Sequence, residues 1–72
     1  RLRRVELGNL GDTSPVGDYV SELRFFFGPG YRIYFMQHGS EILLLLAGGD
    51  KSTQQNDIRT ALKLAKEIRG EA

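Results

Sequence analysis

The chain has 72 residues, with ten Lys and Arg, nine Asp and Glu, and a formal net charge of +1. This length suits one domain, residues 1–72, which buries only about 60% of the surface that its unfolded chain exposes. The slight charge excludes a strongly polycationic chain, and the lack of cysteine excludes disulfides and thiolate-bound metals.

The longest apolar run is Ile42 to Ala47, far short of the ~20 residues that span a membrane. We expect no signal peptide. The absence of cysteine fits a reducing compartment, so we expect a cytoplasmic protein with no membrane partner.

Residues Arg1 to Leu7 resemble the last turns of a helix, and Gly8 suits the position just after a helix end. Seven residues are too few for a stable isolated helix. Since the chain also starts without Met, we expect that the natural protein continues upstream of this N-terminus.

Glycine, proline and small polar residues predict a loop from Asn9 to Asp18. The following segments alternate between β-branched or aromatic residues and turn signals. They predict a three-stranded antiparallel meander, with strands at Tyr19 to Phe27, Tyr31 to Gln37 and Glu41 to Ala47. The aliphatic run of the third strand predicts burial on both faces.

The turn Gly28-Pro29-Gly30 predicts that Phe27 lies opposite Tyr31. Side chains alternate along each strand, so this pairing defines two faces. One face is apolar and the other mixed; the mixed face, where we expect any chemistry, carries Glu22, Arg24, Phe26, Arg32, Tyr34 and Met36.

Apolar residues recur at helical spacing from Ile58 to Ile68, and Gly70 suits the helix end. Ser52 with Gln55 has the spacing of a capping box. This helix must cover the sheet, and the predicted fold class is therefore α+β: a short N-terminal helix remnant, the meander and a C-terminal helix.

The segments GNLGD, VSELR, FGPGYRIYF, LLLL and GGDKSTQQNDIRTA follow one another in this order. In this combination the chain resembles the RelE/ParE superfamily of toxins, most closely the HigB-like branch of phage-derived addiction-module killer proteins. The resemblance extends from Arg1 to about Ala65, and it departs from the family pattern where a first strand and most of a helical hairpin are missing.

The resemblance implies a RelE-like fold and the toxin of a type II toxin–antitoxin system. Many such toxins are mRNA endonucleases that act on the ribosome, where a 2′-hydroxyl attacks the adjacent phosphate without a metal. It also implies a cognate antitoxin, usually of helix-turn-helix type, as partner beside the ribosome and mRNA. We expect no cofactor and no bound metal.

Such a reaction needs a base, cations for the developing phosphorane charge, and an acid. Arg32 matches the arginine that contacts the scissile phosphate in RelE-type toxins, and Lys51 matches the basic residue after the third strand. Tyr34 would donate a proton or stack on a base. We assign these three residues as catalytic; the alternatives are an arginine paired with Glu22 or Glu41, a surface lysine and a packing tyrosine.

Arg24 and His38 are assigned to RNA binding. Arg24 shares the mixed face with Arg32, and the alternative is an ordinary surface charge. His38 is the one imidazole, but a lone histidine in a turn is usually inert. Tyr31 is expected to be structural, and Gln54 and Asp57 to stabilise the helix start. No residue is an obvious general base.

Two other functions stay open. In the first alternative, the chain is a non-nucleolytic toxin or interaction protein, either a gyrase poison like the ParE branch or an inactive toxin that only binds its antitoxin. In the second alternative, the chain associates with a copy of itself, because apolar surface is left where N-terminal helices normally pack.

Overall fold

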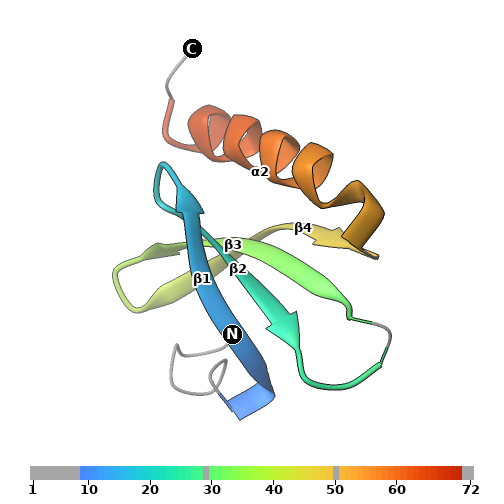
Figure 1. The fold of residues 1–72 in the computed structure, drawn as a ribbon. Helices are drawn as coiled ribbons and strands as arrows, with labels where there is room; N and C mark the ends of the chain where they lie inside the picture. Colours follow the sequence, from blue (N-terminus) through green and yellow to red (C-terminus); the bar gives the residue numbers. More distant parts are fainter. Residues whose placement is uncertain (1–8, 29, 50, 71–72) are drawn as a thin grey trace.

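The computed structural model describes residues 9–28, 30–49 and 51–70. Four strands follow one another in the chain and in the sheet: β1 Gly11–Gly17, β2 Val20–Phe25, β3 Arg32–His38 and β4 Glu41–Gly48. A short 3₁₀ turn, Lys51–Thr53, leads into helix α2, Gln54–Ile68 (Figure 1). The α+β class is confirmed. The predicted helix remnant at Arg1 to Leu7 lies outside the described residues.

The sheet has four strands rather than the predicted three, because much of the predicted loop at Asn9 to Asp18 is strand β1. Its turn-like composition is that of an edge strand, which tolerates proline and glycine. A Cβ at Gly11 would lie 2.0 Å from the carbonyl oxygen of Arg24, so glycine lets β1 approach β2 closely. The register shifts between Pro15 and Gly17.

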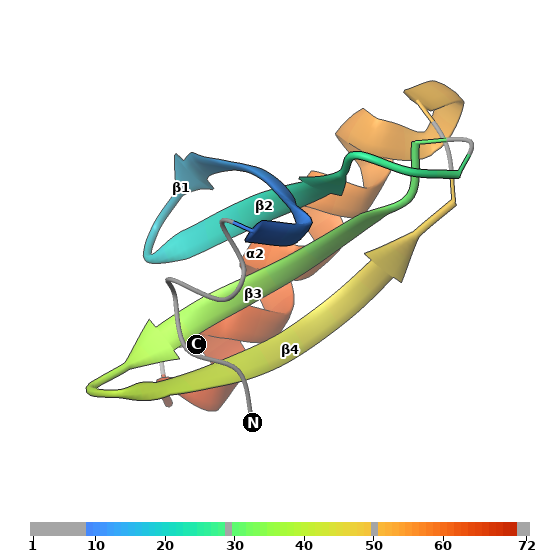
Figure 2. The ribbon, with the colours of Figure 1, turned by 90° about the horizontal axis from the view of Figure 1, so that it is seen from below.

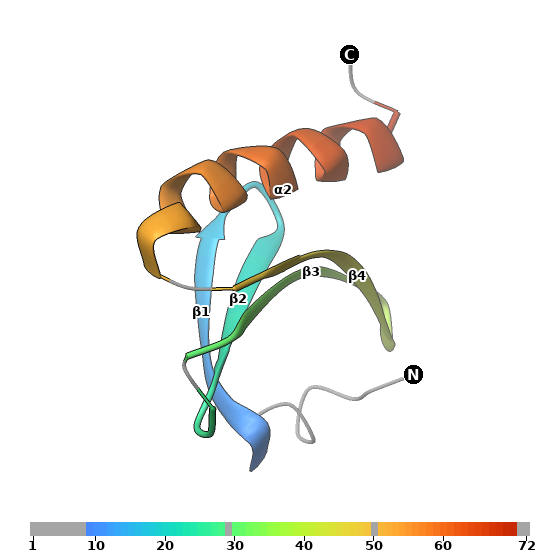
Figure 3. The same ribbon diagram turned by 90° about the vertical axis from the view of Figure 1, so that its right-hand side faces the viewer.

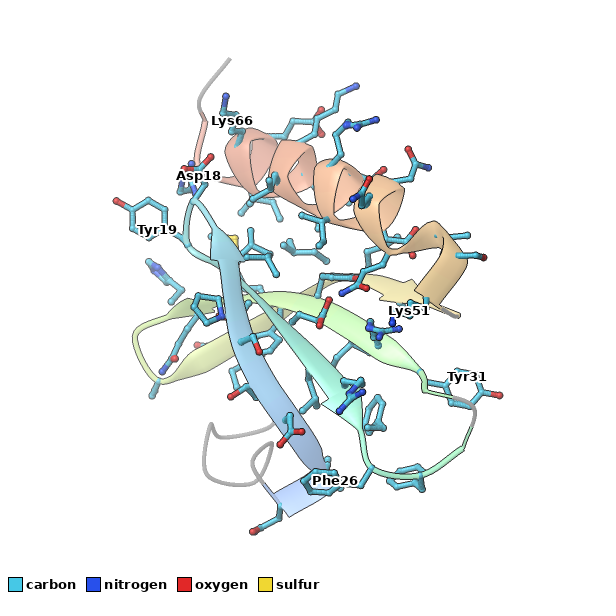
Figure 4. The ribbon with its side chains drawn as sticks, in the orientation of Figure 1. Asp18, Tyr19, Phe26, Tyr31, Lys51 and Lys66 are labelled. Carbon is cyan, nitrogen blue, oxygen red and sulfur yellow. The ribbon has the colours of Figure 1, made fainter. Side chains whose placement is uncertain are left out.

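The turn between β1 and β2 places two non-glycine residues at positive φ, Asp18 at 39° and Tyr19 at 72°. Two such residues in succession are characteristic of the primed two-residue turns of β-hairpins, whose twist matches the strands. The side chain of Tyr19 projects outward from this turn (Figure 4).

The predicted pairing of Phe27 with Tyr31 is wrong, because β2 ends at Phe25 and Arg24 lies opposite Arg32. Every partner is displaced by two residues. Since side chains alternate with a period of two, this displacement leaves the predicted division into two faces unchanged.

The prediction that the third strand is buried on both faces is also wrong. This strand, β4, is the second edge of the sheet, and Leu44 at its centre is 64% exposed. A bulge interrupts its pairing with β3 between the Tyr34–Leu46 and Phe35–Leu44 pairs. The aliphatic run therefore does not identify a central strand.

Helix α2 lies across one face of the arched sheet (Figure 3). Ala61 and Ala65 are fully buried against Val20, Tyr34 and Met36. Helix α2 begins at Gln54 with Thr53 as its N-cap residue, and that residue makes no side-chain cap hydrogen bond. As predicted, Gly70 follows the helix end, with φ of 78°.

The opposite face of the sheet is apolar as well. Leu23 and Phe35 are buried there, with Leu10, Phe25, Ile33 and Ile42 half-buried around them. Among the described elements only α2 is a helix, and it lies behind the sheet when this face is viewed (Figure 2). Counting only the residues that the structure describes, this second face is therefore only partly covered.

Candidate functional site

Charged residues from three strands meet in one row across the sheet, at the end where β2 leads into β3. Asp12 lies opposite Arg24, Arg24 opposite Arg32, and Arg32 opposite Gly48. The strands are about 4.8 Å apart, so the row places the two predicted arginines next to each other.

Arg32 is only 7% exposed, so it is buried in the sheet rather than solvated. Its Nε lies 3.7 Å from Oε1 of Glu22, and its Nη1 donates a hydrogen bond to the Gly30 carbonyl oxygen at 3.3 Å. The side chain of Gln54 donates to the other oxygen of Glu22 at 2.8 Å. Glu22 therefore links α2 to the arginine.

Arg24 differs from Arg32 in its exposure. Its Nη2 lies 3.6 Å from Oδ2 of Asp12, and the two side chains are 55% and 63% exposed. An ion pair this open to solvent contributes little, about 0–1 kcal/mol, so the guanidinium can change partner at small cost.

Lys51 is exposed, two residues beyond Gly49, at the start of the turn that leads into α2 (Figure 4). The following helix start is held by Asp57, which accepts a hydrogen bond from Thr53 at 2.7 Å. A Cβ at Gly48 would lie 2.6 Å from Oδ2 of Asp57, so glycine lets β4 end against this carboxylate. The end of β4 thereby brings Lys51 to the same end of the sheet as the arginine row.

Tyr34 lies behind the row and is fully buried under α2. Its hydroxyl has no hydrogen-bond partner among the described residues. Burial, together with the Glu22 and Asp57 carboxylates, raises the pKa of Tyr34 to about 12, against the opposing effect of Arg32. The phenol therefore keeps its proton at neutral pH, and its ring has no exposed surface on which a base could stack.

His38 is not part of this arrangement. It ends β3, opposite Glu41 and six residues beyond Arg32, which corresponds to about 20 Å along a strand. It is exposed beside the β3–β4 turn.

Three exposed aromatic residues at the same end of the sheet as the arginine row had no predicted role in binding. Phe26, Phe27 and Tyr31 are 65%, 60% and 50% exposed, although Tyr31 was expected to be structural. The run of aromatic residues around the Gly28 turn was visible in the sequence, but only the end of β2 at Phe25 shows that these rings lie beyond the paired strands.

A second feature lies at the other end of the sheet. A depression of 360 Å³ is lined by Pro15, Gly17 to Ser21 and Gln37. Beside it, Arg69 stacks 4.6 Å above the ring of Tyr19 and donates a hydrogen bond to the Asp18 carbonyl oxygen at 2.7 Å. These contacts tie the β1–β2 turn to the end of α2, away from the arginine row.

Within the described part of the chain, no three His, Cys, Asp or Glu residues are grouped so that they could hold a metal ion. No helix of that part is long and apolar enough to cross a membrane.

An uncharacterized protein of Haemophilus influenzae is 46% identical to this chain over 68 residues, which cover 94% of this chain and 69% of that protein. The chain belongs to the same family as this protein. No protein-family model matches the chain, and no solved structure matches it. The relative's name gives no activity, so inference about function depends on the residues themselves.

Proposed function

We propose that the chain is the toxin of a type II toxin–antitoxin system and cleaves mRNA on translating ribosomes. The observation that carries this proposal is the placement of three cations, Arg24, Arg32 and Lys51, at one end of the sheet. The resemblance of the GPGYRIYF and GGDKSTQ segments to RelE/ParE toxins supports it. The cognate antitoxin and the ribosome are the proposed partners.

In the proposed reaction, the 2′-hydroxyl of one nucleotide loses its proton to water as its oxygen attacks the neighbouring phosphorus. The bond to the 5′-oxygen breaks, and that oxygen takes a proton from water, which leaves a 2′,3′-cyclic phosphate and a 5′-hydroxyl. Guanidinium and ammonium groups would stabilise the charge that develops on the phosphoryl oxygens. Arginine suits this role because it can donate two parallel hydrogen bonds to a phosphate. Tyr34 is fully buried under α2, so its phenol would lie behind the arginines rather than donate a proton to the RNA.

Two carboxylates set the order in which the cations would engage. Asp12 competes weakly for the exposed Arg24, and Lys51 is exposed, so these two residues would meet the phosphate first. Arg32 forms an ion pair with Glu22, and both side chains are about nine-tenths buried. To contact the substrate phosphate, Arg32 would therefore have to give up the Glu22 carboxylate. His38 has no part in this proposal because it lies at the far end of β3.

The test uses the purified chain in a reconstituted translation reaction, with the 3′ and 5′ ends of the mRNA mapped. Cleavage is expected at codons held in the ribosome, and a 2′-deoxynucleotide at the cleaved linkage should abolish it because the attacking hydroxyl is gone. Intact mRNA, or equal cleavage at the deoxy linkage, would reject the proposal.

A further inference from the structure

Aromatic rings on both sides of the turn between β2 and β3 are open to solvent, at the end of the sheet where the arginine row lies. Phe27 and Tyr31 flank this turn. Phe27 is 60% exposed and Tyr31 is 50% exposed. Tyr31 is the residue immediately before Arg32, and in Figure 4 its ring points away from the body of the protein on the side where Lys51 lies.

Each ring packs against a neighbouring residue of the chain. A Cβ at Gly28 would lie 3.1 Å from two ring carbons of Tyr31, so the ring rests on the turn, and the positive φ of Gly28, 75°, keeps that position for glycine. The ring of Phe27 lies 5.4 Å from the ring of Phe25, at an interplanar angle of 46°. Rings held in place but open to solvent lose little freedom when they bind a ligand.

The described residues that flank this turn are joined by backbone hydrogen bonds. The amide of Phe25 donates to the carbonyl oxygen of Tyr31 at 3.0 Å, and the amide of Phe26 donates to that of Leu10 at 3.1 Å. Tyr31 is therefore held to the end of β2, and Phe26, the neighbour of Phe27, is held to the residue just before β1.

We infer that Tyr31 and Phe27 are a stacking platform for unpaired bases of single-stranded RNA, at the same end of the sheet as the phosphate contacts proposed for Arg24 and Lys51. This inference rests on the proposed function and describes how that site would hold its RNA substrate. Unpaired bases stack on exposed aromatic side chains, while neighbouring arginines and lysines contact the phosphates. The positions of Arg24 and Lys51 at this end of the sheet fit that division of contacts.

The experiment measures binding of a short single-stranded RNA that carries the fluorescent base 2-aminopurine. Tyr31→Ala should weaken binding by about 5- to 150-fold, the range for losing one base–aromatic stack, and should remove the fluorescence quenching that stacking causes. Tyr31→Phe keeps the ring and should bind like the wild-type chain. Tyr19→Ala removes an aromatic residue that is 76% exposed at the other end of the sheet, and should also leave binding unchanged.

Salt dependence separates stacking from phosphate contact. Lys51→Ala should reduce the dependence of affinity on salt, whereas Tyr31→Ala should leave that dependence unchanged, because stacking releases no counterions. Thermal unfolding of each variant serves as the control for folding; Tyr31 is half exposed, so its truncation should leave the midpoint near that of the wild type.

Three outcomes would overturn the inference. If Tyr31→Ala binds RNA like the wild type while the wild type cleaves mRNA on ribosomes, the platform is absent but the proposed function stands. If the wild-type chain neither binds RNA nor cleaves mRNA, both fail. If Tyr31→Ala changes only the mass of the protein in solution, the turn is a protein interface instead.

Discussion

At the scale of single residues, the Tyr34 phenol combines full burial with a hydroxyl that has no hydrogen-bond partner among the described residues. Its pKa is about 12 in the folded chain and near the ordinary value of 10.0 in the unfolded chain. The folded state therefore holds the proton over a range in which the unfolded state releases it.

The sign of the pH dependence follows from this difference. Below about pH 10 both states keep the proton, so Tyr34 contributes no pH dependence there; between about pH 10 and 12 the free energy of unfolding should fall, by about 2–3 kcal/mol in total. Urea unfolding at a series of pH values measures this fall. Tyr34→Phe cannot ionise and should lose that part of it; an identical profile in the variant would contradict the assignment.

The two arginines show which part of the site the sequence could predict. Alternation along the strands placed Arg24 and Arg32 on one face, and a two-residue error in register left that result intact. Burial could not be predicted in the same way. The Glu22 that pairs with Arg32 accepts a hydrogen bond from Gln54, which is 32 residues away in the chain and is brought there by α2.

At the scale of elements, β1 depends on one close backbone contact. A Cβ at Gly11 would lie 2.0 Å from the Arg24 carbonyl oxygen and 2.9 Å from the Phe25 Cα, both of which are backbone atoms that cannot move aside cheaply. Gly11→Ala should therefore destabilise the chain by about 1–3 kcal/mol or more, the usual cost of overpacking.

Gly49→Ala is the matched control, because a Cβ at Gly49 meets no atom within 4 Å. Urea unfolding of both variants gives the comparison. Equal stability of Gly11→Ala and Gly49→Ala would show that β1 does not pack against β2 as described.

The same strand explains why the sequence predicted three strands instead of four. Gly11, Pro15 and Gly17 are typical of loops, and propensity alone places no strand there. The free edge of β2 supplies the hydrogen-bond partners that make these residues a strand. Helix α2 was predictable because its apolar residues recur at the helical period, although Ile68 at its end is 55% exposed.

At the scale of the whole molecule, the described residues cover the two faces of the sheet to different extents. Helix α2 covers one face, while Leu44 and the half-buried Ile33 and Ile42 remain accessible on the other. An exposed apolar face of this kind favours association. We therefore expect the 72-residue chain to self-associate, with a mass by light scattering that rises with protein concentration.

Leu44→Lys should lower that mass, because it places a charge on the partly covered face. Ile68→Lys is the matched control, since Ile68 is similarly exposed, 55% against 64%, but lies on α2. A monomeric mass at high concentration, or equal effects of the two variants, would show that this face does not drive association.

Cleavage of mRNA by a chain that lacks the two exposed cations is the most direct test of the proposed site. Arg24→Ala combined with Lys51→Ala should fold normally, because both side chains are exposed, and should lower the rate of mRNA cleavage on translating ribosomes by at least about 100-fold. Mapped mRNA ends that are unchanged in this variant, or absent with the wild-type chain, would contradict the proposal that these cations act on RNA.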